Sequence, residues 1–325
     1  MISSSSSTTA EETEICLNSI YCFNPGKPLG QGGFGQIYIG ENTQTHEPIA
    51  VKTEQVVKKS YLQIEYDILT VLQGSPGVPT VYQFFKSEDR NYLVMEALGR
   101  SIEQIFILHK QTFSLKTIIQ IALQMIDRIE YLHLKGFIHR DIKPGNFTIG
   151  RGEFKDVIYM IDFGLSKRYR EGINNAHIAY KDGKGLTGTS RYASLFTHYG
   201  IEQSRRDDIE GMGYNLVFLL KGSLPWQSVR AKNKKEKNKK VMEMKKEISL
   251  DELCSGFPKE FKMLIQYARG LNFEEKPDYN GIRIMFAKLM HVNKFELDNK
   301  FDWSDEDVDE LECRVKEMKK KQNMK

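Results

Sequence analysis

The chain has 325 residues, of which 40% are hydrophobic and 28% are charged, and its formal net charge at pH 7 is +4. This composition is typical of a globular protein that is large enough to form two lobes, each with its own core. No stretch reaches the roughly 18 consecutive apolar residues that a membrane span requires. We therefore expect no membrane association, and the modest net charge gives no reason to expect a nucleic-acid partner.

The N-terminal segment 1–20 begins MISSSSSTTAEETE and lacks both the basic region and the apolar core of a secretory signal. Its polar composition predicts a disordered leader. We therefore expect a protein of the cytoplasm, the nucleus or both. The four cysteines form no C-x-x-C pair of the metal-binding kind, and we interpret them as reduced thiols in a reducing compartment; they are Cys16, Cys22, Cys254 and Cys313.

Residues 21–96 predict a small lobe rich in β-strands. Runs of β-branched and aromatic residues, separated by Gly, Pro, Asn or Asp, occur at 37–40, 48–52, 80–85 and 91–96. One helix interrupts them in the segment SYLQIEYDILTVLQG, where Ser60 can cap the start and Gly74 can end it.

The first motif in this lobe is glycine-rich and reads Gly30-Gln31-Gly32-Gly33-Phe34-Gly35. Glycines suit a loop whose backbone approaches phosphates closely. The same G-x-G-x-x-G spacing also fits a dinucleotide-binding fingerprint, in which the glycines open a helix. Here an alternating apolar segment at 36–40 follows the motif, so a β-hairpin folded over a nucleotide is the favoured interpretation.

The second motif is Ile49-Ala50-Val51-Lys52, which places a lysine at the end of an apolar strand. A half-buried lysine needs an opposite charge. Glu65 lies at the edge of the apolar stripe of the predicted helix, so its carboxylate is expected to point toward the sheet and to pair with Lys52.

After residue 100 the pattern changes to longer helices, which we predict at 114–136, 207–221, 258–270 and 279–291. The resulting fold class is α+β with two lobes: a small β-rich N-lobe at 21–96 with one main helix, a connector at 97–100, and a larger, mostly helical C-lobe at 101–303. The remaining residues, 304–325, predict a charged helical tail that packs on its own lobe or binds a partner.

The C-lobe contains a third motif, His139-Arg140-Asp141-Ile142-Lys143-Pro144-Gly145-Asn146, and Asp162-Phe163-Gly164 follows an apolar strand. Two carboxylates and one amide in this order match the needs of phosphoryl transfer. Asp141 can accept or orient the attacking hydroxyl, whereas Asn146 and Asp162 offer oxygen ligands for magnesium.

Taken together, these motifs resemble those of a eukaryotic protein kinase, specifically the casein kinase 1 family. Five further segments carry this resemblance: LTGTSRYAS at 186–194, HYGIEQSRRDDIE at 198–210, GSLPWQ at 222–227, KPDY at 276–279 and FDW at 301–303. The resemblance implies a monomeric Ser/Thr kinase that uses ATP and Mg2+.

The resemblance also implies roles for single residues. Asp141, Lys143 and Asn146 would be catalytic, and Asn146 and Asp162 would bind the metal. Asp208 would brace the backbone of the catalytic loop. The nucleotide would be bound by residues of the glycine loop, the strands, the helix, the connector region and the second acidic motif: Gly30, Gly32, Gly35, Ile37, Ala50, Lys52, Glu65, Met95, Leu98 and Asp162.

The family binds protein substrates that carry an acidic or phosphorylated residue upstream of the target hydroxyl. By resemblance, Arg191 and Lys237 would form one anion site, and Arg140, Lys167 and Lys184 a second. The alternative is that Arg191 is merely paired with a nearby acid.

Three features depart from simple expectations. The triplet Ser194-Leu195-Phe196 replaces the Ser-Ile-Asn typical of the family, and Phe196 either packs into the C-lobe or alters the peptide-binding surface. Gly145 and Gly33 add backbone freedom within functional loops. The segment 232–247 contains eight lysines and three glutamates, which fits a solvated helix face, a docking surface for acidic partners or a nuclear-import patch.

We weigh three functions. The first is an active Ser/Thr kinase for acidic or phosphate-primed substrates. The second is a pseudokinase or scaffold that binds partners through the lysine-rich segment, although the intact metal ligands and Lys52 argue against it. The third is a nucleotide-dependent oxidoreductase, which requires a helix directly after Gly35.

Overall fold

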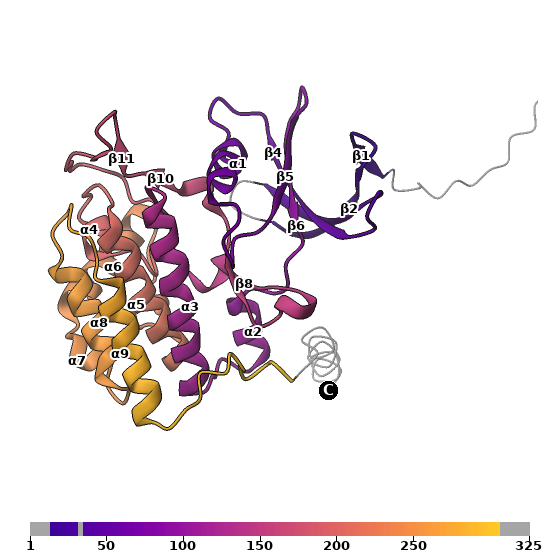
Figure 1. The fold of residues 1–325 in the computed structure, drawn as a ribbon. Coiled ribbons are helices and arrows are strands. Elements are labelled where there is room, and N and C mark those ends of the chain that lie inside the picture. The colour runs from indigo at the N-terminus through magenta and orange to yellow at the C-terminus, as the bar shows by residue number, and fades with distance from the viewer. Residues whose placement is uncertain (1–13, 32–34, 306–325) are drawn as a thin grey trace, which may run out of the picture. The chain divides into compact units, whose positions relative to one another are not determined.

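The computed structural model describes residues 14–31 and 35–305. The chain divides into two compact units, and the division falls between Leu98 and Gly99. The N-lobe unit comprises residues up to 73 together with 79–98, and the C-lobe unit comprises 74–78 and the residues from 99 onward. A β-rich unit and a helical unit confirm the predicted two-lobed α+β fold (Figure 1).

The N-lobe unit is built on one antiparallel six-stranded sheet with the strand order β1-β2-β3-β4-β6-β5. The strands are β1 (Ile15–Leu17), β2 (Tyr21–Gln31), β3 (Gln36–Asn42), β4 (Pro48–Gln55), β5 (Val81–Lys86) and β6 (Arg90–Glu96). Helix α1 (Tyr61–Leu72) packs on β5 and β6. The hydroxyl of Ser60 accepts a hydrogen bond from Gln63 N, as expected of an N-cap.

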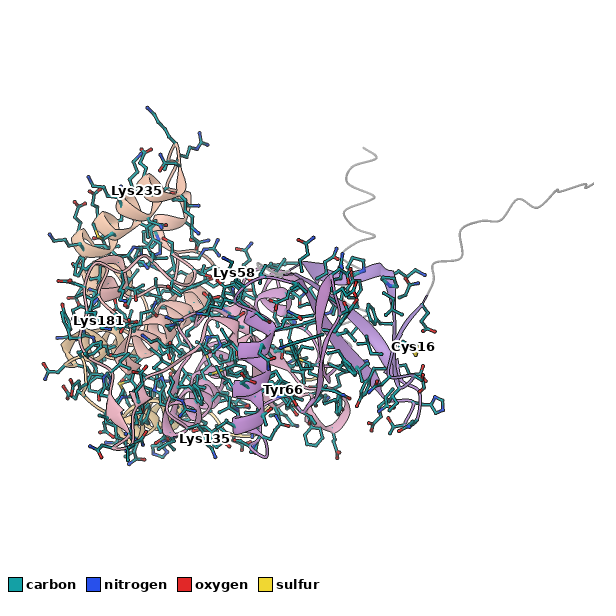
Figure 2. All side chains as sticks on the ribbon, turned by 90° about the horizontal axis from the view of Figure 1, so that it is seen from above. Cys16, Lys58, Tyr66, Lys135, Lys181 and Lys235 are labelled. Atoms are coloured by element: carbon teal, nitrogen blue, oxygen red, sulfur yellow. A yellow bond between two sulfur atoms is a disulfide. The ribbon has the colours of Figure 1, made fainter. Side chains whose placement is uncertain are left out.

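The expectation of a disordered leader over 1–20 is wrong for the part of it that the structure describes as a strand. Residues 15–17 form β1, which pairs with β2 because Ile15 and Leu17 pack beside the aromatic core of the sheet. Residues 1–13 lie outside the described range. The same pairing sets Cys16 directly opposite Cys22, and the two form a disulfide at the periphery of this unit (Figure 2).

The interpretation of all cysteines as reduced thiols is therefore wrong for Cys16 and Cys22. Their registry on neighbouring antiparallel strands brings the two sulfur atoms together, which a reading of sequence spacing does not show. Cys254 is a free and buried thiol.

The C-lobe unit is a bundle of helices around the long, buried α5, whose neighbours α3 and α8 pack against it (Figure 1). Its α-helices are α2 (Ile102–Leu108), α3 (Leu115–Leu134), α4 (Leu195–His198), α5 (Arg205–Lys221), α6 (Lys234–Glu247), α7 (Leu250–Leu253), α8 (Lys259–Gly270) and α9 (Tyr279–Val292). The helices predicted from periodicity correspond to α3, α5, α8 and α9, with bounds that differ by one or two residues.

Short two-stranded ladders carry the loops of this unit. Strand β8 pairs with β9, β7 with β10, and β11 with β12, each antiparallel. Their bounds are β7 (Phe137–Ile138), β8 (Phe147–Ile149), β9 (Ile158–Met160), β10 (Lys167–Arg168), β11 (Arg170–Glu171) and β12 (Ala176–His177). Among the described residues, no helix is long and apolar enough to cross a membrane.

The FDW segment at 301–303 contacts the N-terminal end of α3. The Asp302 carboxylate accepts hydrogen bonds from the backbone N and the hydroxyl of Ser114, both at 2.6 Å. The Trp303 ring stacks on Phe301 with 4.7 Å between ring centroids and packs against Phe113 at 5.2 Å. These contacts make Phe301 and Trp303 part of the core, while Asp302 between them is exposed. The predicted tail helix begins at 304, and its residues from 306 onward lie outside the described range.

Replacing Trp303 with Ala should lower the free energy of unfolding by about 3–5 kcal/mol, because the ring is almost fully buried and its removal leaves a cavity. Urea unfolding followed by circular dichroism measures the loss. Val292→Ala is the control, since Val292 is 76% exposed and its truncation should have little effect. A Trp303→Ala protein as stable as the control would show that the segment does not belong to the core.

Candidate active site

The glycine motif lies on the hairpin formed by β2 and β3. Gly30 is paired with Ile37 across the two strands, and Gly35 lies directly before β3. Gly32 and Gly33 lie outside the described residues. A Cβ atom on Gly35 would collide with the backbone of Thr53, so close strand approach requires glycine there. Because a strand and not a helix follows Gly35, the oxidoreductase hypothesis loses its basis.

Lys52 and Glu65 form a buried ion pair within the N-lobe unit. Lys52 Nζ lies 2.6 Å from Glu65 Oε1, and their side chains are 11% and 2% exposed. The expected pairing of these two residues is therefore present. Removing one partner would leave an uncompensated buried charge, which typically costs about 3–5 kcal/mol.

The strand registers arrange further side chains around Lys52. Ile37 on β3 lies directly across from Lys52, and Ala50 lies across from Met95 on β6. Met95 is buried, and Leu98, half-buried, is the last residue of the N-lobe unit. These are the residues that sequence reasoning assigns to the nucleotide, and that role stays a prediction.

The catalytic loop of the C-lobe unit is held by a buried carboxylate. Asp208 on α5 accepts hydrogen bonds from His139 N at 2.7 Å and from Arg140 N at 2.9 Å. Arg140 has a φ angle of 68°, a left-handed conformation that a non-glycine residue adopts only when its surroundings enforce it. The bracing contact expected of Asp208 is present.

Asp208 is itself supported from α3 and α9. His133 Nε2 lies 2.9 Å from the Asp208 carboxylate, and His133 Nδ1 lies 2.8 Å from the Tyr279 hydroxyl. Burial alone would raise the pKa of Asp208, but the contact with His133 and the hydrogen bond from His139 outweigh it, and the pKa is lowered. The KPDY segment thereby reaches the catalytic loop through a chain of buried polar groups.

Three groups from this unit converge on Asp141. Lys143 Nζ lies 2.6 Å from Asp141 Oδ2, and Thr189 N donates to Asp141 Oδ1 at 2.7 Å. Asn146 Nδ2 donates to the backbone carbonyl of Asp141 at 2.9 Å and lies 3.3 Å from its Oδ2. With both oxygens held, the carboxylate has a fixed orientation, as a group that orients a hydroxyl needs.

Asp162 is brought to Asn146 by the end of strand β9. Ile161 N donates to the carbonyl oxygen of Asn146 at 3.0 Å, and Asp162 then turns with a left-handed φ of 69°. A carboxylate and an amide oxygen on neighbouring turns are the hard ligands that Mg2+ prefers. Such a donor set fits a magnesium ion.

A comparison with protein-family models gives a match to the protein kinase domain over residues 23–278. The chain belongs to the protein kinase domain family. Protein kinases transfer phosphoryl groups to proteins and typically use ATP and Mg2+. The buried Lys52–Glu65 pair, the oriented Asp141 and the adjacent backbone segments that carry Asn146 and Asp162 are consistent with that chemistry.

The second predicted anion site contains a carboxylate that sequence reasoning missed. Lys167 Nζ lies 2.9 Å and Lys184 Nζ 3.5 Å from Oε2 of Glu202, which is buried. Burial opposes ionisation of Glu202, but the two lysines and Arg140 outweigh it and lower its pKa. The predicted cations do converge, and an internal acid already compensates their charge, so an external anion would have to compete with Glu202.

The first predicted anion site is only partly assembled within the C-lobe unit. Arg191 is 37% exposed in its side chain, and its Nη1 lies 3.8 Å from Glu103 Oε1. This contact fits the alternative in which Arg191 pairs with a nearby acid, although exposed pairs of this length contribute little. Lys237 lies exposed on α6, and its partnership with Arg191 stays a prediction.

The structure describes two departures from the casein kinase 1 pattern, Gly145 and Phe196, and accounts for the second. A Cβ atom on Gly145 would lie 2.9 Å from Glu103 Oε2, but this is the end of a flexible side chain that is 38% exposed, so the contact does not require glycine. Phe196 lies under the guanidinium of Arg206, with 3.6 Å between the Arg206 Cζ atom and the ring centroid. Phe196 therefore packs within the C-lobe unit, which is the first of the two roles expected from the sequence.

His198, at the end of α4, stays neutral over the physiological range. Burial, and then the neighbouring Lys245 ammonium, lower the pKa of His198 to about 3. Its Nε2 atom lies 3.2 Å from the carbonyl oxygen of Ser190. Because the unfolded chain binds this proton near pH 6.5 and the folded chain only near pH 3, acid favours the unfolded state.

Replacing His198 with Gln should therefore reduce the loss of stability that occurs as the pH falls. Between pH 7 and pH 4 the free energy of unfolding of the wild type should fall by about 3 kcal/mol more than that of His198→Gln. This difference follows from the pKa of His198, which is about 6.5 in the unfolded chain and about 3 in the folded chain. Urea titrations at several pH values measure this difference, with the exposed His46→Gln as control. Parallel curves for wild type and His198→Gln would contradict the assignment.

Proposed function

We propose that this protein kinase transfers the γ-phosphate of ATP, with Mg2+, to Ser or Thr residues of proteins that carry acidic or phosphorylated residues upstream of the target. The proposal includes membership of the casein kinase 1 family. The observation that supports it most is the environment of Asp141. Its carboxylate contacts Lys143 and accepts a hydrogen bond from the backbone of Thr189, and Thr189 lies two residues before Arg191 in the chain.

This proximity links the catalytic group to the cationic segment. The Thr189 amide contacts Asp141 directly, and the chain continues to Arg191, whose side chain is partly exposed. A peptide whose hydroxyl approached Asp141 could place an upstream anion near this arginine. The family-specific segments around 186–194 and 198–210 support the same substrate class, and the choice of Ser and Thr rests on that resemblance.

The alternative is a pseudokinase or scaffold that binds partners through the lysine-rich segment 232–247, which includes all of α6. Lys235 lies at the outer edge of the C-lobe unit (Figure 2), where it is accessible to a partner. Against the alternative stands the completeness of the chemical groups. A protein without activity needs neither a buried Lys52–Glu65 pair nor an oriented Asp141.

A positional-scanning peptide array with Mg-ATP tests the proposal directly. We expect phosphate incorporation at Ser and Thr, with acidic or phosphorylated residues favoured upstream of the target. Asp162→Asn serves as the inactive control, because it removes a metal-ligand carboxylate. Nucleotide binding without any transfer by the wild-type protein would favour the scaffold.

Replacing Arg191 with Ala tests the anion site. For a phosphate-primed peptide, kcat/KM should fall about tenfold or more, because a charge-assisted contact is lost, whereas an unprimed peptide should change less than about twofold. Arg151→Ala is the matched control, since Arg151 is exposed elsewhere on the C-lobe unit. Equal losses on primed and unprimed peptides would remove Arg191 from substrate recognition.

A further inference from the structure

Lys245, near the end of α6, is the exception among the lysines of the segment 232–247. It is fully buried, whereas its neighbour Lys246 is exposed. The interpretation of this segment as a solvated face is therefore wrong for Lys245. A buried ammonium group is costly unless polar partners surround it.

Two partners of Lys245 are backbone carbonyls of the turn formed by residues 189–193, and a third is His198 on α4, whose Nε2 lies 3.3 Å from Lys245 Nζ. Lys245 Nζ donates to the carbonyl oxygen of Ser190 at 2.9 Å and to that of Ala193 at 2.6 Å. Trp226 Nε1 donates to the carbonyl oxygen of Arg191 at 2.8 Å. Three carbonyls of one turn are therefore held by two side chains from outside it.

Aromatic rings complete the surroundings of the ammonium group. Lys245 Nζ lies 4.6 Å from the ring centroid of Tyr214 and 5.0 Å from that of Trp226. Both distances are within the range of cation–π attraction, which strengthens where water is excluded. The nearby acid, Glu210, is bound to Arg269 at 3.0 Å and accepts from the Tyr214 hydroxyl at 2.7 Å.

The opposite side of the turn contacts the catalytic loop. Tyr192 N and Ala193 N both donate to the carbonyl oxygen of Thr189, which closes the turn. Thr189 N in turn donates to Asp141 Oδ1 at 2.7 Å. A continuous set of hydrogen bonds therefore leads from Lys245 through the turn to the carboxylate of Asp141.

We propose that Lys245 is a positioning residue for phosphoryl transfer: its buried ammonium group holds the turn 189–193 and thereby orients Asp141. The inference concerns the protein kinase reaction and rests on the proposed function only for the choice of peptide. A core that needed only volume at this position would be filled by an apolar side chain at lower cost. The carbonyl oxygens of Ser190 and Ala193 explain why a donor is present.

The test compares Lys245→Met, which keeps an unbranched side chain one atom shorter and removes the donors, with Lys246→Met as the matched control. Backbone hydrogen exchange measures whether the turn is held. In Lys245→Met the amides of residues 188–194 should exchange at least tenfold faster than in the wild type, while those of α9 stay unchanged. The same comparison on Trp226→Phe, which removes the hydrogen bond to Arg191 together with the five-membered ring of the indole, should accelerate the same amides.

Kinetics separate positioning from a merely structural role. With Mg-ATP and a peptide selected from the array, kcat of Lys245→Met should fall at least tenfold, while the dissociation constant for ATP stays within about threefold of the wild-type value. Lys246→Met should match the wild type in both. Faster exchange spread evenly over the C-lobe unit, or unchanged exchange at 188–194 in Lys245→Met, would overturn the proposal.

The two readouts also separate this inference from the proposed function. Hydrogen exchange requires no turnover, so it decides whether Lys245 holds the turn even if the wild type phosphorylates no peptide. Absence of wild-type activity would contradict the proposed function but not the role of Lys245 in holding the turn. If Lys245→Met fails to fold, Lys245→Gln, a shorter side chain without a charge, replaces it in the same exchange comparison and is judged by the same outcomes.

Discussion

The C-lobe unit depends on the buried carboxylate of Asp208. A charge in the protein interior is tolerated only when donors surround it, and here His139 N, Arg140 N and His133 supply them. The same bonds hold Arg140 in a left-handed conformation, from which Asp141 follows directly. One electrostatic requirement, the satisfaction of Asp208, thus determines the path of the loop that carries the chemistry.

Asp141 is in turn fixed from both sides of its carboxylate. Lys143 binds one oxygen and the Thr189 amide the other, and the turn that provides this amide is held by Lys245 and Trp226. Little reorganisation of these groups is needed during reaction, which is how preorganised sites lower a barrier. The N-lobe unit contributes a comparable element in the Lys52–Glu65 pair.

Much of this could be predicted from the sequence where the signal is local. The cap Ser60, the strands around the glycine motif and the orientation of Glu65 follow from spacing and periodicity. Signals that depend on tertiary packing could not be predicted. Lys245 lies among other lysines in the sequence, and its burial is explained only by the turn 189–193 that packs against it. The ion pairs of Glu202 could not be predicted either, because its partners Lys167 and Lys184 are distant from it in the chain.

The central claim, that Asp208 orients the catalytic loop of an active kinase, is tested most directly by Asp208→Asn in a peptide phosphorylation assay with Mg-ATP. Asn keeps the shape of the side chain but removes the charge that the backbone amides of His139 and Arg140 surround. The account predicts a folded protein whose kcat falls at least tenfold, while Asp182→Asn, an exposed control, retains the wild-type rate. A folded Asp208→Asn protein with wild-type kcat would contradict it.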